Sequence, residues 1–309
     1  MKKTLSLVLA FFLLLGQTVF AQQENPQNQK PEYDIVKAKK ELAEKYADKK
    51  KSYLSEEEMN KRTREVEKVL NELAADIAAG KKTKEDAKNI LEKMEVYILE
   101  EPEQNDISIL STGTDLTLNP VMMTFDSNTS RWTLTGGGYW KNDNWFYDKT
   151  GVWWGYVGET KNMGGVDSIG ITLFNTGGSY KTSVVSSLGS VTDHNGWTVY
   201  MYNPSHGDGK YGVAFDYQDK IKLTKVDSFG PYDSSDFTYF GSGFAASVSY
   251  DSNFVYYNGY ARTMYAHTWD TTTINNIGFS GSGGQYGVTV NFSTSSNKFL
   301  IFNNYDTTF

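Results

Sequence analysis

The sequence predicts an all-β antiparallel sandwich or barrel in its C-terminal part, preceded by a small all-α hairpin or bundle. Two observations predict this division. All seven tryptophans, and every one of the 28 glycines except Gly16 and Gly80, lie from Ser111 onward in the 309-residue chain. Apolar residues before Ser111 recur at three- and four-residue intervals, whereas later ones alternate in short segments between clusters of Gly, Asn, Asp and Ser. Because 39% of the residues are hydrophobic, the chain is expected to form a packed body.

The first residues have the pattern of a secretion signal. Lys2 and Lys3 precede an apolar run from Leu5 to Leu15, and small or compact residues follow around Ala21. We predict a signal peptide over residues 1–21, in preference to an uncleaved anchor, because the run is shorter than the roughly 20 residues that cross a bilayer. The sequence therefore predicts a secreted, extracellular protein, and since it contains no cysteine a lipid-anchored form is excluded.

Residues 22–30 are rich in Gln and Asn and predict a flexible leader. Residues 31–100 are predicted to form a helical domain that opens at Pro31. Its apolar stripes favour a self-contained core, and the alternative is a docking face for the β domain or a partner. Insertion into a membrane surface is disfavoured, because the region is net acidic and such helices carry a cationic polar face.

Capping residues mark where the predicted helices begin. Ser55 and Glu58, and likewise Thr83 and Asp86, have the spacing at which each side chain bonds the other residue's backbone N–H. Gly80 is a typical helix stop. The apolar stripes are Ile35, Leu42, Ala43 and Tyr46; Met59, Val66, Leu70, Leu73 and Ile77; and Ala87, Ile90, Leu91, Met94, Tyr97 and Ile98.

Residues 101–119 are predicted to be a linker, and residues 120–309 an antiparallel β-sandwich domain. Its turns carry the Asn, Asp and Gly residues that hairpins need. The predicted turns are Asp193–Gly196, Gly207–Gly209, Tyr257–Gly259 and Ser295–Asn297. The predicted strands are Val121–Phe125, Trp132–Thr135, Val152–Val157, Ile169–Phe174, Trp197–Tyr202, Tyr211–Tyr217, Tyr260–Trp269, Tyr286–Phe292 and Lys298–Phe302.

Several classes of function are excluded or disfavoured. The formal net charge of −7 argues against a nucleic-acid partner, which would need clustered Lys and Arg. Without cysteine there is no thiolate nucleophile or thiolate metal site, and the three histidines are too far apart in sequence for a paired zinc site. Gly136-Gly137-Gly138 precedes aromatic residues and no helix, so we interpret it as a bend or bulge in a strand and not as a phosphate loop. No catalytic or metal-ligating residue is assigned.

Carboxylates leave an enzyme and a metal ion as open alternatives. An aspartate-dependent polysaccharide hydrolase would need a paired acid and base. The aspartates available to it are Asp143, Asp148, Asp216, Asp219 and Asp270, most of them in turn-like contexts. No cofactor is expected. Calcium is a weak alternative: loop oxygens are suitable ligands for it, but their spacing matches no defined calcium loop. Those oxygens belong to Asp143, Asn144 and Asp148, or to Asp233 and Asp236.

Aromatic residues are the strongest positive signal. Trp153 and Trp154 are adjacent, so in a strand their rings point to opposite faces and only one can enter a given core. Tyr265, His267 and Trp269 share one face of a predicted strand, which lies either outward as a ladder or in the core. The candidate ligand-binding residues are Trp140, Trp145, Trp153, Trp154, Trp197, Tyr265, His267 and Trp269.

Three functions follow from these patterns. The first is a secreted binding protein for a glycan or cell-wall polymer, because exposed rings beside polar groups can stack on sugars. The second is a membrane-active or antimicrobial β protein, because residues 244–250 alternate between apolar and small polar side chains as a barrel-lining strand does. The third is the polysaccharide hydrolase. An extracellular glycan is thus the predicted partner and a membrane the alternative, while the oligomeric state is left open.

Overall fold

The computed structural model describes residues 33–47, 54–101, 111–112, 115–142, 144, 148, 158–178, 180–193, 195–222, 241–281 and 285–309. Contacts join Asp34–Phe309 into one compact unit. This unit consists mostly of antiparallel strands, with three helices ahead of nearly all of them. The predicted combination of N-terminal helices and an antiparallel β part is thus confirmed. The signal peptide, the leader and the strand Val152–Val157 lie outside the described residues, and the domain boundaries stay a prediction.

The helices begin where the capping residues predict. Helix α1 spans Ile35–Ala47, α2 spans Glu56–Ala78 and α3 spans Lys84–Lys93. Both predicted capping boxes are present, on Ser55 and on Thr83. The third stripe was expected to stay helical to Ile98, and this was wrong: α3 stops at Lys93, and Glu95 takes a left-handed φ of 58°. Strand β1 (Val96–Ile98) follows, because its backbone pairs with a neighbouring strand.

The first sheet has the strand order β1-β4-β5-β10-β7-β8. Its members beyond β1 are β4 (Met122–Asp126), β5 (Arg131–Trp140), β10 (Gly243–Tyr250), β7 (Val184–Thr192) and β8 (Thr198–Met201), with β2 (Ser111–Thr112) and β3 (Leu116–Leu118) beside β5. The Gly136–Gly138 run was interpreted as a bend or bulge, but it lies inside β5 and pairs with β10 in unbroken register. Neighbouring elements approach the backbone of these three glycines too closely for a Cβ atom to fit.

The second sheet has the order β14-β11-β6-β9. It contains β14 (Lys298–Phe302), β11 (Tyr257–Thr268), β6 (Thr160–Gly178) and β9 (Gly212–Lys222), with β15 (Thr307–Thr308) paired to β11. Strands β12 (Ile274–Phe279) and β13 (Val288–Phe292) form a separate hairpin. Two 3-10 turns, η3 (Ser252–Tyr256) and η4 (Gln285–Gly287), precede β11 and β13.

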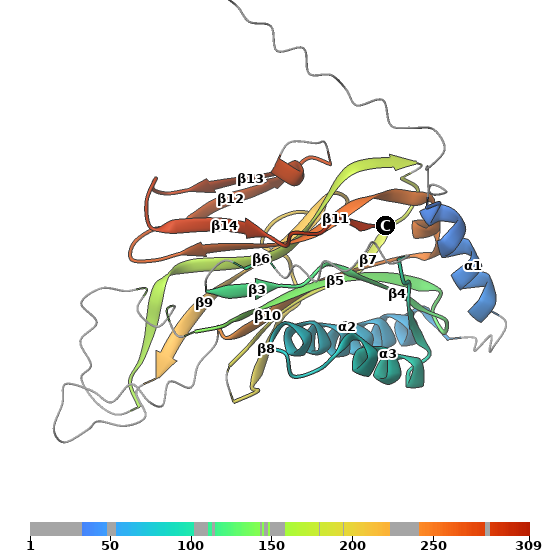
Figure 1. The fold of residues 1–309 in the computed structure, drawn as a ribbon, viewed down its shortest axis with the longest axis horizontal. Coiled ribbons are helices and arrows are strands. Elements are labelled where there is room, and N and C mark those ends of the chain that lie inside the picture. The colour runs from blue at the N-terminus through green and yellow to red at the C-terminus, as the bar shows by residue number, and fades with distance from the viewer. Residues whose placement is uncertain are drawn as a thin grey trace, which may run out of the picture. The chain divides into compact units, whose positions relative to one another are not determined.

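These elements stack in layers (Figure 1). The inner faces of the two sheets meet: the Phe244 ring on β10 stacks on Tyr265 of β11 with centroids 4.2 Å apart. Helices α2 and α3 cover the outer face of the first sheet. The β12–β13 hairpin covers the outer face of the second, where Ile277 and Val288 pack on Met264. Both outer faces are therefore covered, so each sheet is buried on two sides.

Helix α2 buries two sides. One side packs against α3 and β1, in a cluster of Val66, Leu70, Leu73, Ala87, Leu91 and Val96. A different side lies on the first sheet, against β5, β10 and β7. The stripe thus builds a small helical core, as expected, and the docking alternative also holds for the second side. No helix in the described residues is long and apolar enough to span a membrane.

Candidate functional site

Strands β5, β10 and β7 have two chemically different faces. Residues paired directly across an antiparallel ladder share a face, and the registers place the hydroxyl-bearing residues together. The face under α2 carries Thr133, Thr135, Ser186, Ser190, Ser247 and Ser249, together with Leu188 and Ala245. The opposite face, toward the second sheet, carries Trp132, Leu134, Val191, Phe244, Ala246, Val248 and Tyr250, together with Ser187. A polar sheet face is therefore buried beneath a helix, where an apolar face would ordinarily lie.

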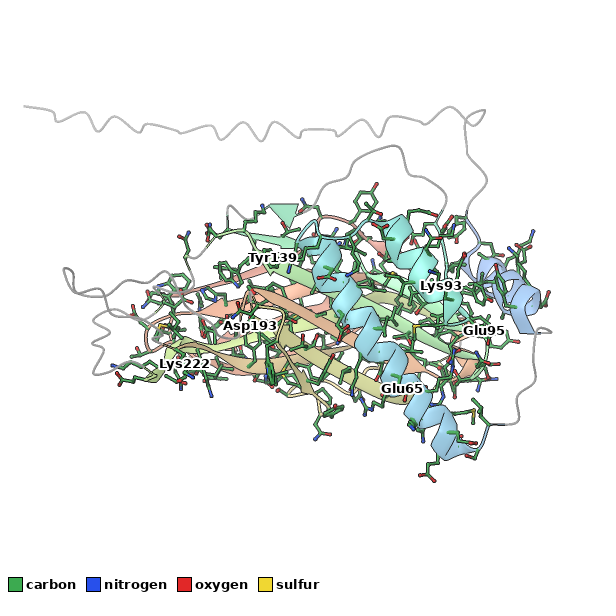
Figure 2. The ribbon with its side chains drawn as sticks, turned by 90° about the horizontal axis from the view of Figure 1, so that it is seen from below. Glu65, Lys93, Glu95, Tyr139, Asp193 and Lys222 are labelled. Carbon is green, nitrogen blue, oxygen red and sulfur yellow. The ribbon has the colours of Figure 1, made fainter. Side chains whose placement is uncertain are left out.

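Helix α2 meets this face through polar side chains, and Figure 2 shows it crossing the strands obliquely. The Glu67 carboxylate accepts hydrogen bonds from Ser186 Oγ at 2.7 Å and Ser249 Oγ at 2.8 Å. Asn71 Nδ2 donates to the backbone oxygen of Leu188 at 3.1 Å. Farther along, Arg131 on β5 donates to Thr63 Oγ1 at 2.8 Å. Specific hydrogen bonds thus hold the helix to strands β5, β10 and β7, while apolar packing joins it to β1 at the sheet edge.

This interface carries electrostatic costs. Burial raises the pKa of Glu67, while the hydrogen bonds from Ser186 and Ser249 and the charge of Arg64 act against the rise. Among the described residues, Asn71 Oδ1 and Thr135 Oγ1 are buried there without a hydrogen-bond partner. Buried carboxylates and unpaired polar atoms both reduce the net stability of a contact. The docking of α2 therefore combines specific hydrogen bonds with groups that are costly to bury.

Gly137 sets how closely α2 approaches the sheet. A Cβ atom placed on Gly137 would lie 2.8 Å from Cβ of Ala74, closer than carbon atoms pack. Asn119, beside β5, donates to the backbone oxygen of Ala74 at 2.7 Å and fixes the same contact. Two residues along the same ladder, a Cβ on Gly243 would lie an ordinary 3.5 Å from Cβ of Ala75. The helix thus touches β5 and β10 through small residues.

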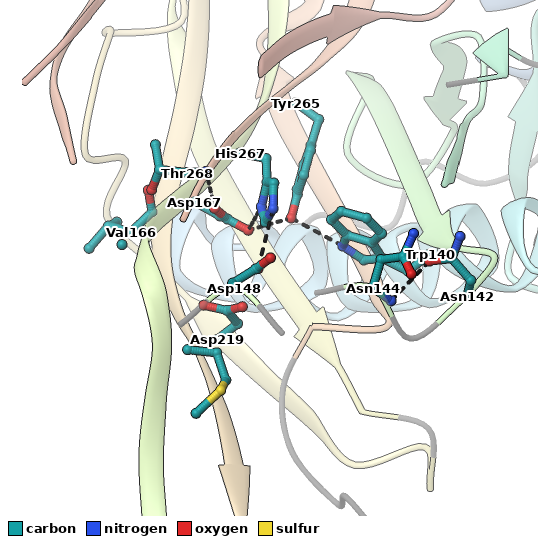
Figure 3. Close-up of polar contacts among 12 residues, drawn as sticks. Trp140, Asn142, Asn144, Asp148, Val166, Asp167, Asp219, Tyr265, His267 and Thr268 are labelled. Carbon is teal, nitrogen blue, oxygen red and sulfur yellow. Dashed lines mark hydrogen bonds and ion pairs between the residues drawn. The ribbon is translucent and has the colours of Figure 1, made fainter. Parts of the chain in front are cut away.

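A second cluster of polar groups surrounds His267 on β11 (Figure 3). Nδ1 of His267 lies 2.8 Å from Oδ2 of Asp167 on β6, and Nε2 lies 3.2 Å from Oδ2 of Asp148. The hydroxyl of Tyr265 donates to Asp167 at 2.7 Å. That hydroxyl also receives the Trp140 indole N–H at 3.3 Å and lies 2.6 Å from the Tyr217 hydroxyl. The cluster therefore ties both sheets together around one imidazole.

The cluster holds its charges far from their ordinary titration ranges. Burial alone would lower the pKa of His267, but the Asp167 and Asp148 carboxylates raise it to about 10. Burial raises the pKa of Asp148 to about 6, although the bond to His267 and its charge act against this. Burial and the charge of Asp167 raise the pKa of Asp219 well above its ordinary range. At neutral pH the cluster thus contains an imidazolium.

This geometry bears on the alternatives left open by the aspartates. It brings together Asp148 and Asp219, and the backbone N–H of Asp270 donates to the backbone oxygen of Asp148 at 2.6 Å, whereas Asp216 bonds His206 at 3.0 Å. The polar side chains around His267, those of Asp148, Asp167, Asp219, Tyr217 and Tyr265, are each less than one tenth exposed. In the described part of the chain, no group of three or more His, Asp or Glu side chains is placed to hold a metal ion. Asp143, Asp233 and Asp236 lie outside the described residues.

Sequence reasoning missed two of the residues that organise these clusters. Asp167 lies between Val166 and Ser168 in β6, and nothing in its spacing pairs it with His267, 100 positions away. Glu67 was treated as part of a solvated face. On a helix, Glu67 shares a face with Thr63, Arg64, Leu70 and Asn71, so the spacing places it on a face that is partly polar and partly apolar. That spacing does not identify the serines that bond its carboxylate.

The predicted ligand-binding residues do not form one exposed surface. Trp140 and Tyr265 are buried, and His267 lies between the aspartates. Trp269 is half-buried beside His267, with ring centroids 5.7 Å apart. Trp197 is 69% exposed. The remaining three, Trp145, Trp153 and Trp154, lie outside the described residues. The Tyr265–His267 ladder thus faces the core, as one of the two sequence alternatives had it.

Comparison with known proteins adds little to this geometry. No family model and no curated protein matches the sequence. Among solved structures, the chain is similar to one described as "Pore forming protein", at 9% sequence identity and a TM-score of 0.21. That similarity covers 60% of this chain and 84% of the other. A likeness of this size defines neither the fold nor the activity of the chain.

Proposed function

We propose that this is a secreted, membrane-active β-sandwich protein in which strands β5, β10 and β7 form part of an aqueous pore after α2 leaves them. The two faces of these strands carry the proposal. A strand that spans a membrane alternates lipid-facing apolar residues with polar residues that face water. The Ser and Thr residues under α2 would face the water, and the apolar inner face would turn to lipid once the second sheet also separates from it.

Two further features support this function. Membrane-spanning strands need about 9–11 residues; β5 and β7 have 10 and 9, and β10 has 8, one fewer than that range. The polar contacts of α2 also suit a removable cover, because Ser, Thr and Glu side chains that lose their partners can be hydrated by the water of a pore. An apolar seam would oppose such a release through the hydrophobic effect.

A reversible cross-link tests whether α2 must leave the sheet. Disulfides require Cβ atoms about 3.5–4.5 Å apart, and residues 75 and 243 meet this distance. Because the chain has no cysteine, the double variant Ala75→Cys with Gly243→Cys contains a single possible disulfide. We expect the oxidised double variant to lose dye release from lipid vesicles and the reduced one to recover it.

The two single variants and the wild type are the matched controls, and reductant should leave their dye release unchanged. Wild-type protein that releases no dye from neutral or anionic vesicles would contradict the function. Equal release from the oxidised and reduced double variant would contradict the role of α2 while leaving membrane activity in place. The two parts of the proposal therefore fail separately.

Glycan binding is a second candidate, favoured by the exposed indole of Trp197. A single ring on a surface can stack on one sugar, with polar neighbours binding its hydroxyls. This candidate would be supported if the wild type is retained on insoluble peptidoglycan, cellulose or chitin and the Trp197→Ala variant is not. Absence of the wild type from all three polymers would remove it.

A further inference from the structure

Exposed apolar side chains gather at the edge strand β8. Of the six large apolar or aromatic residues exposed in the described part of the chain, Trp197, Val199 and Tyr202 lie within one short segment. Their exposed fractions are 69%, 40% and 46%. Strand β8 is the last strand of its sheet and pairs with β7. We call Trp197, Val199, Tyr200 and Tyr202, with Arg64 and Lys68 of α2, the β8 patch.

A tight turn holds Trp197 at the end of this hairpin. The Asp193 carboxylate accepts hydrogen bonds from the backbone N–H groups of Asn195, at 3.0 Å, and Trp197, at 2.8 Å. Gly196 supplies the left-handed φ of 84° that the turn requires. Trp197 is therefore held outward by an ordered turn.

The patch has rings on both faces of its strand. Tyr200 pairs with Ser190, on the α2 side of the sheet, and its hydroxyl donates to Glu72 at 2.5 Å. Val199 pairs with Val191, which lies on the opposite face. Rings on two faces cannot make one flat platform for a sugar chain. Both faces can enter an apolar medium that surrounds the strand.

Cations lie where the rim of such a surface would be. Lys68 Nζ lies 5.1 Å from the ring centroid of Tyr200 and 5.9 Å from that of Tyr202, and Arg64 Cζ lies 5.5 Å from Tyr202. Trp and Tyr concentrate at the boundary between lipid and water. Lys and Arg beside them extend along apolar surface toward headgroups, and each attracts anionic lipid. Two acidic side chains bond residues of the patch: Glu72 accepts from the Tyr200 hydroxyl, and Glu67 lies 3.3 Å from Arg64.

We propose that the β8 patch is the surface by which the protein first binds a lipid bilayer, with Trp197 and Val199 entering the interface and Lys68 contacting anionic headgroups. This inference rests on the proposed membrane activity and assigns its point of contact. It differs from the pore wall, because the patch lies at the sheet edge and needs no release of α2.

The absence of native cysteine allows the contact to be measured directly. Val199→Cys and, as the control, Tyr256→Cys each place one thiol for an environment-sensitive dye. Tyr256 is 46% exposed, as Tyr202 is, and has Lys40 Nζ 4.9 Å from its ring centroid, but lies outside the patch. Vesicles of phosphatidylcholine, with and without phosphatidylserine, should shift the dye emission to the blue at position 199 and leave that at position 256 unchanged.

Vesicle flotation measures the contribution of each side chain. Trp197→Ala should weaken binding about tenfold, because burial of a large ring is worth at least that factor. Trp197→Phe should restore most of it and Tyr256→Ala should not alter it. Lys68→Gln should weaken binding about fivefold only when phosphatidylserine is present.

Each other outcome overturns a defined part of the inference. Equal dye shifts at positions 199 and 256, unchanged binding of Trp197→Ala, or a wild type that binds neither vesicle would overturn the β8 patch. Loss of glycan retention in Trp197→Ala without any vesicle binding would assign the ring to a sugar instead. Vesicle binding through the patch without dye release would leave the patch standing and contradict the pore. Dye release by the wild type that is unaltered in Trp197→Ala would leave the pore standing and contradict the β8 patch.

Discussion

The hydroxyl of Ser249 on β10 donates a 2.8 Å hydrogen bond to the carboxylate of Glu67 on α2, and neither side chain reaches solvent. This contact joins the polar face of a two-faced sheet to its helical cover. The bond gives the carboxylate a hydrogen-bond donor that carries no charge. The cation beside Glu67 is Arg64, which lies 3.3 Å away and is partly exposed, so it compensates the buried charge only in part. The contact therefore positions α2 while leaving an ionised group in a poor environment.

Glu67→Gln should make the docking of α2 less dependent on pH. The folded state raises the pKa of Glu67 above its ordinary 4.5. Its stabilising contribution is thus full below pH 4.5 and is lost as pH rises through the folded-state value. We expect urea unfolding to show that Glu67→Gln is at least as stable as wild type at pH 8 and releases dye more slowly. Glu67→Ala should instead lose about 2 kcal/mol, because Ser186 and Ser249 lose their acceptor. A Gln variant that is much less stable at pH 8 would contradict this account.

Gly137→Ala should loosen α2 by steric contact. Its new Cβ would meet Cβ of Ala74 at 2.8 Å, and overpacking of this kind costs about 1–3 kcal/mol. We expect a lower free energy of unfolding together with faster dye release. Gly243→Ala is the matched control, since its Cβ has ordinary 3.5 Å packing against the same helix. Identical dye release from both variants would show that helix separation does not limit activity.

His267→Gln should remove the fall in stability that this imidazole contributes as pH rises from 6.5 to 10. Between pH 6.5 and about 10 the folded state holds the imidazole proton more tightly than the unfolded chain does. The stabilisation is therefore full below pH 6.5 and is lost as pH rises through 10. The variant should also unfold about 3 kcal/mol more easily at pH 6, because Asp167 stays buried without its cation. Urea unfolding from pH 5 to 10 tests both expectations, and parallel curves for variant and wild type would refute them.

Asp148→Asn should act in a lower pH range. The folded state raises the pKa of Asp148 from 3.8 to about 6. Its contribution to stability is present below pH 3.8 and is lost as pH rises through 6. The Asn variant should therefore flatten the stability curve between pH 4 and 6 and leave the alkaline part in place. The same unfolding series distinguishes this outcome from that of His267→Gln, which changes the curve above pH 6.5.

Local rules predicted the local features of this fold. The Ser55 and Thr83 caps depend on residues three positions apart, so sequence spacing was sufficient to place the starts of α2 and α3. Strand β14 was predicted with its exact bounds, because a turn with Asn297 at φ 57° precedes it. The end of α3 was missed, because β1 is held by pairing with β4 and not by its own sequence preference.

The sites depend on contacts that spacing does not reveal. His267 meets Asp167 across 100 positions, and Ser249 meets Glu67 across 182. The aromatic surplus was read as a binding surface, yet much of it fills the space between two sheets that are each covered on both faces. Trp140 shows why: its ring packs edge-on against Tyr265 and His267, so the chain needs rings inside as well as outside. The sequence gives the number of aromatic side chains, but the number that is buried depends on how the sheets and helices are layered.

Lys39 should reveal a pH dependence opposite to that of His267. This buried lysine of α1 donates to the backbone oxygens of Phe254 at 2.9 Å and Tyr257 at 2.6 Å. Burial lowers its pKa from 10.5 to about 7. Its contribution to stability is therefore present above pH 10.5 and is lost as pH falls through 7. In the wild type this slope partly offsets that of His267 between pH 7 and 10.

Lys39→Met should remove the offset, so that stability of the variant falls more steeply than that of wild type between pH 7 and 10. Lys40→Met, which alters the adjacent exposed lysine, should keep the wild-type slope. The double variant of Lys39→Met and His267→Gln should be nearly flat over this range, since both opposing groups are gone. Urea unfolding at four pH values decides the matter. A Lys39→Met slope equal to that of wild type would mean that α1 separates from β11 before the rest unfolds, so that Lys39 titrates freely in both states.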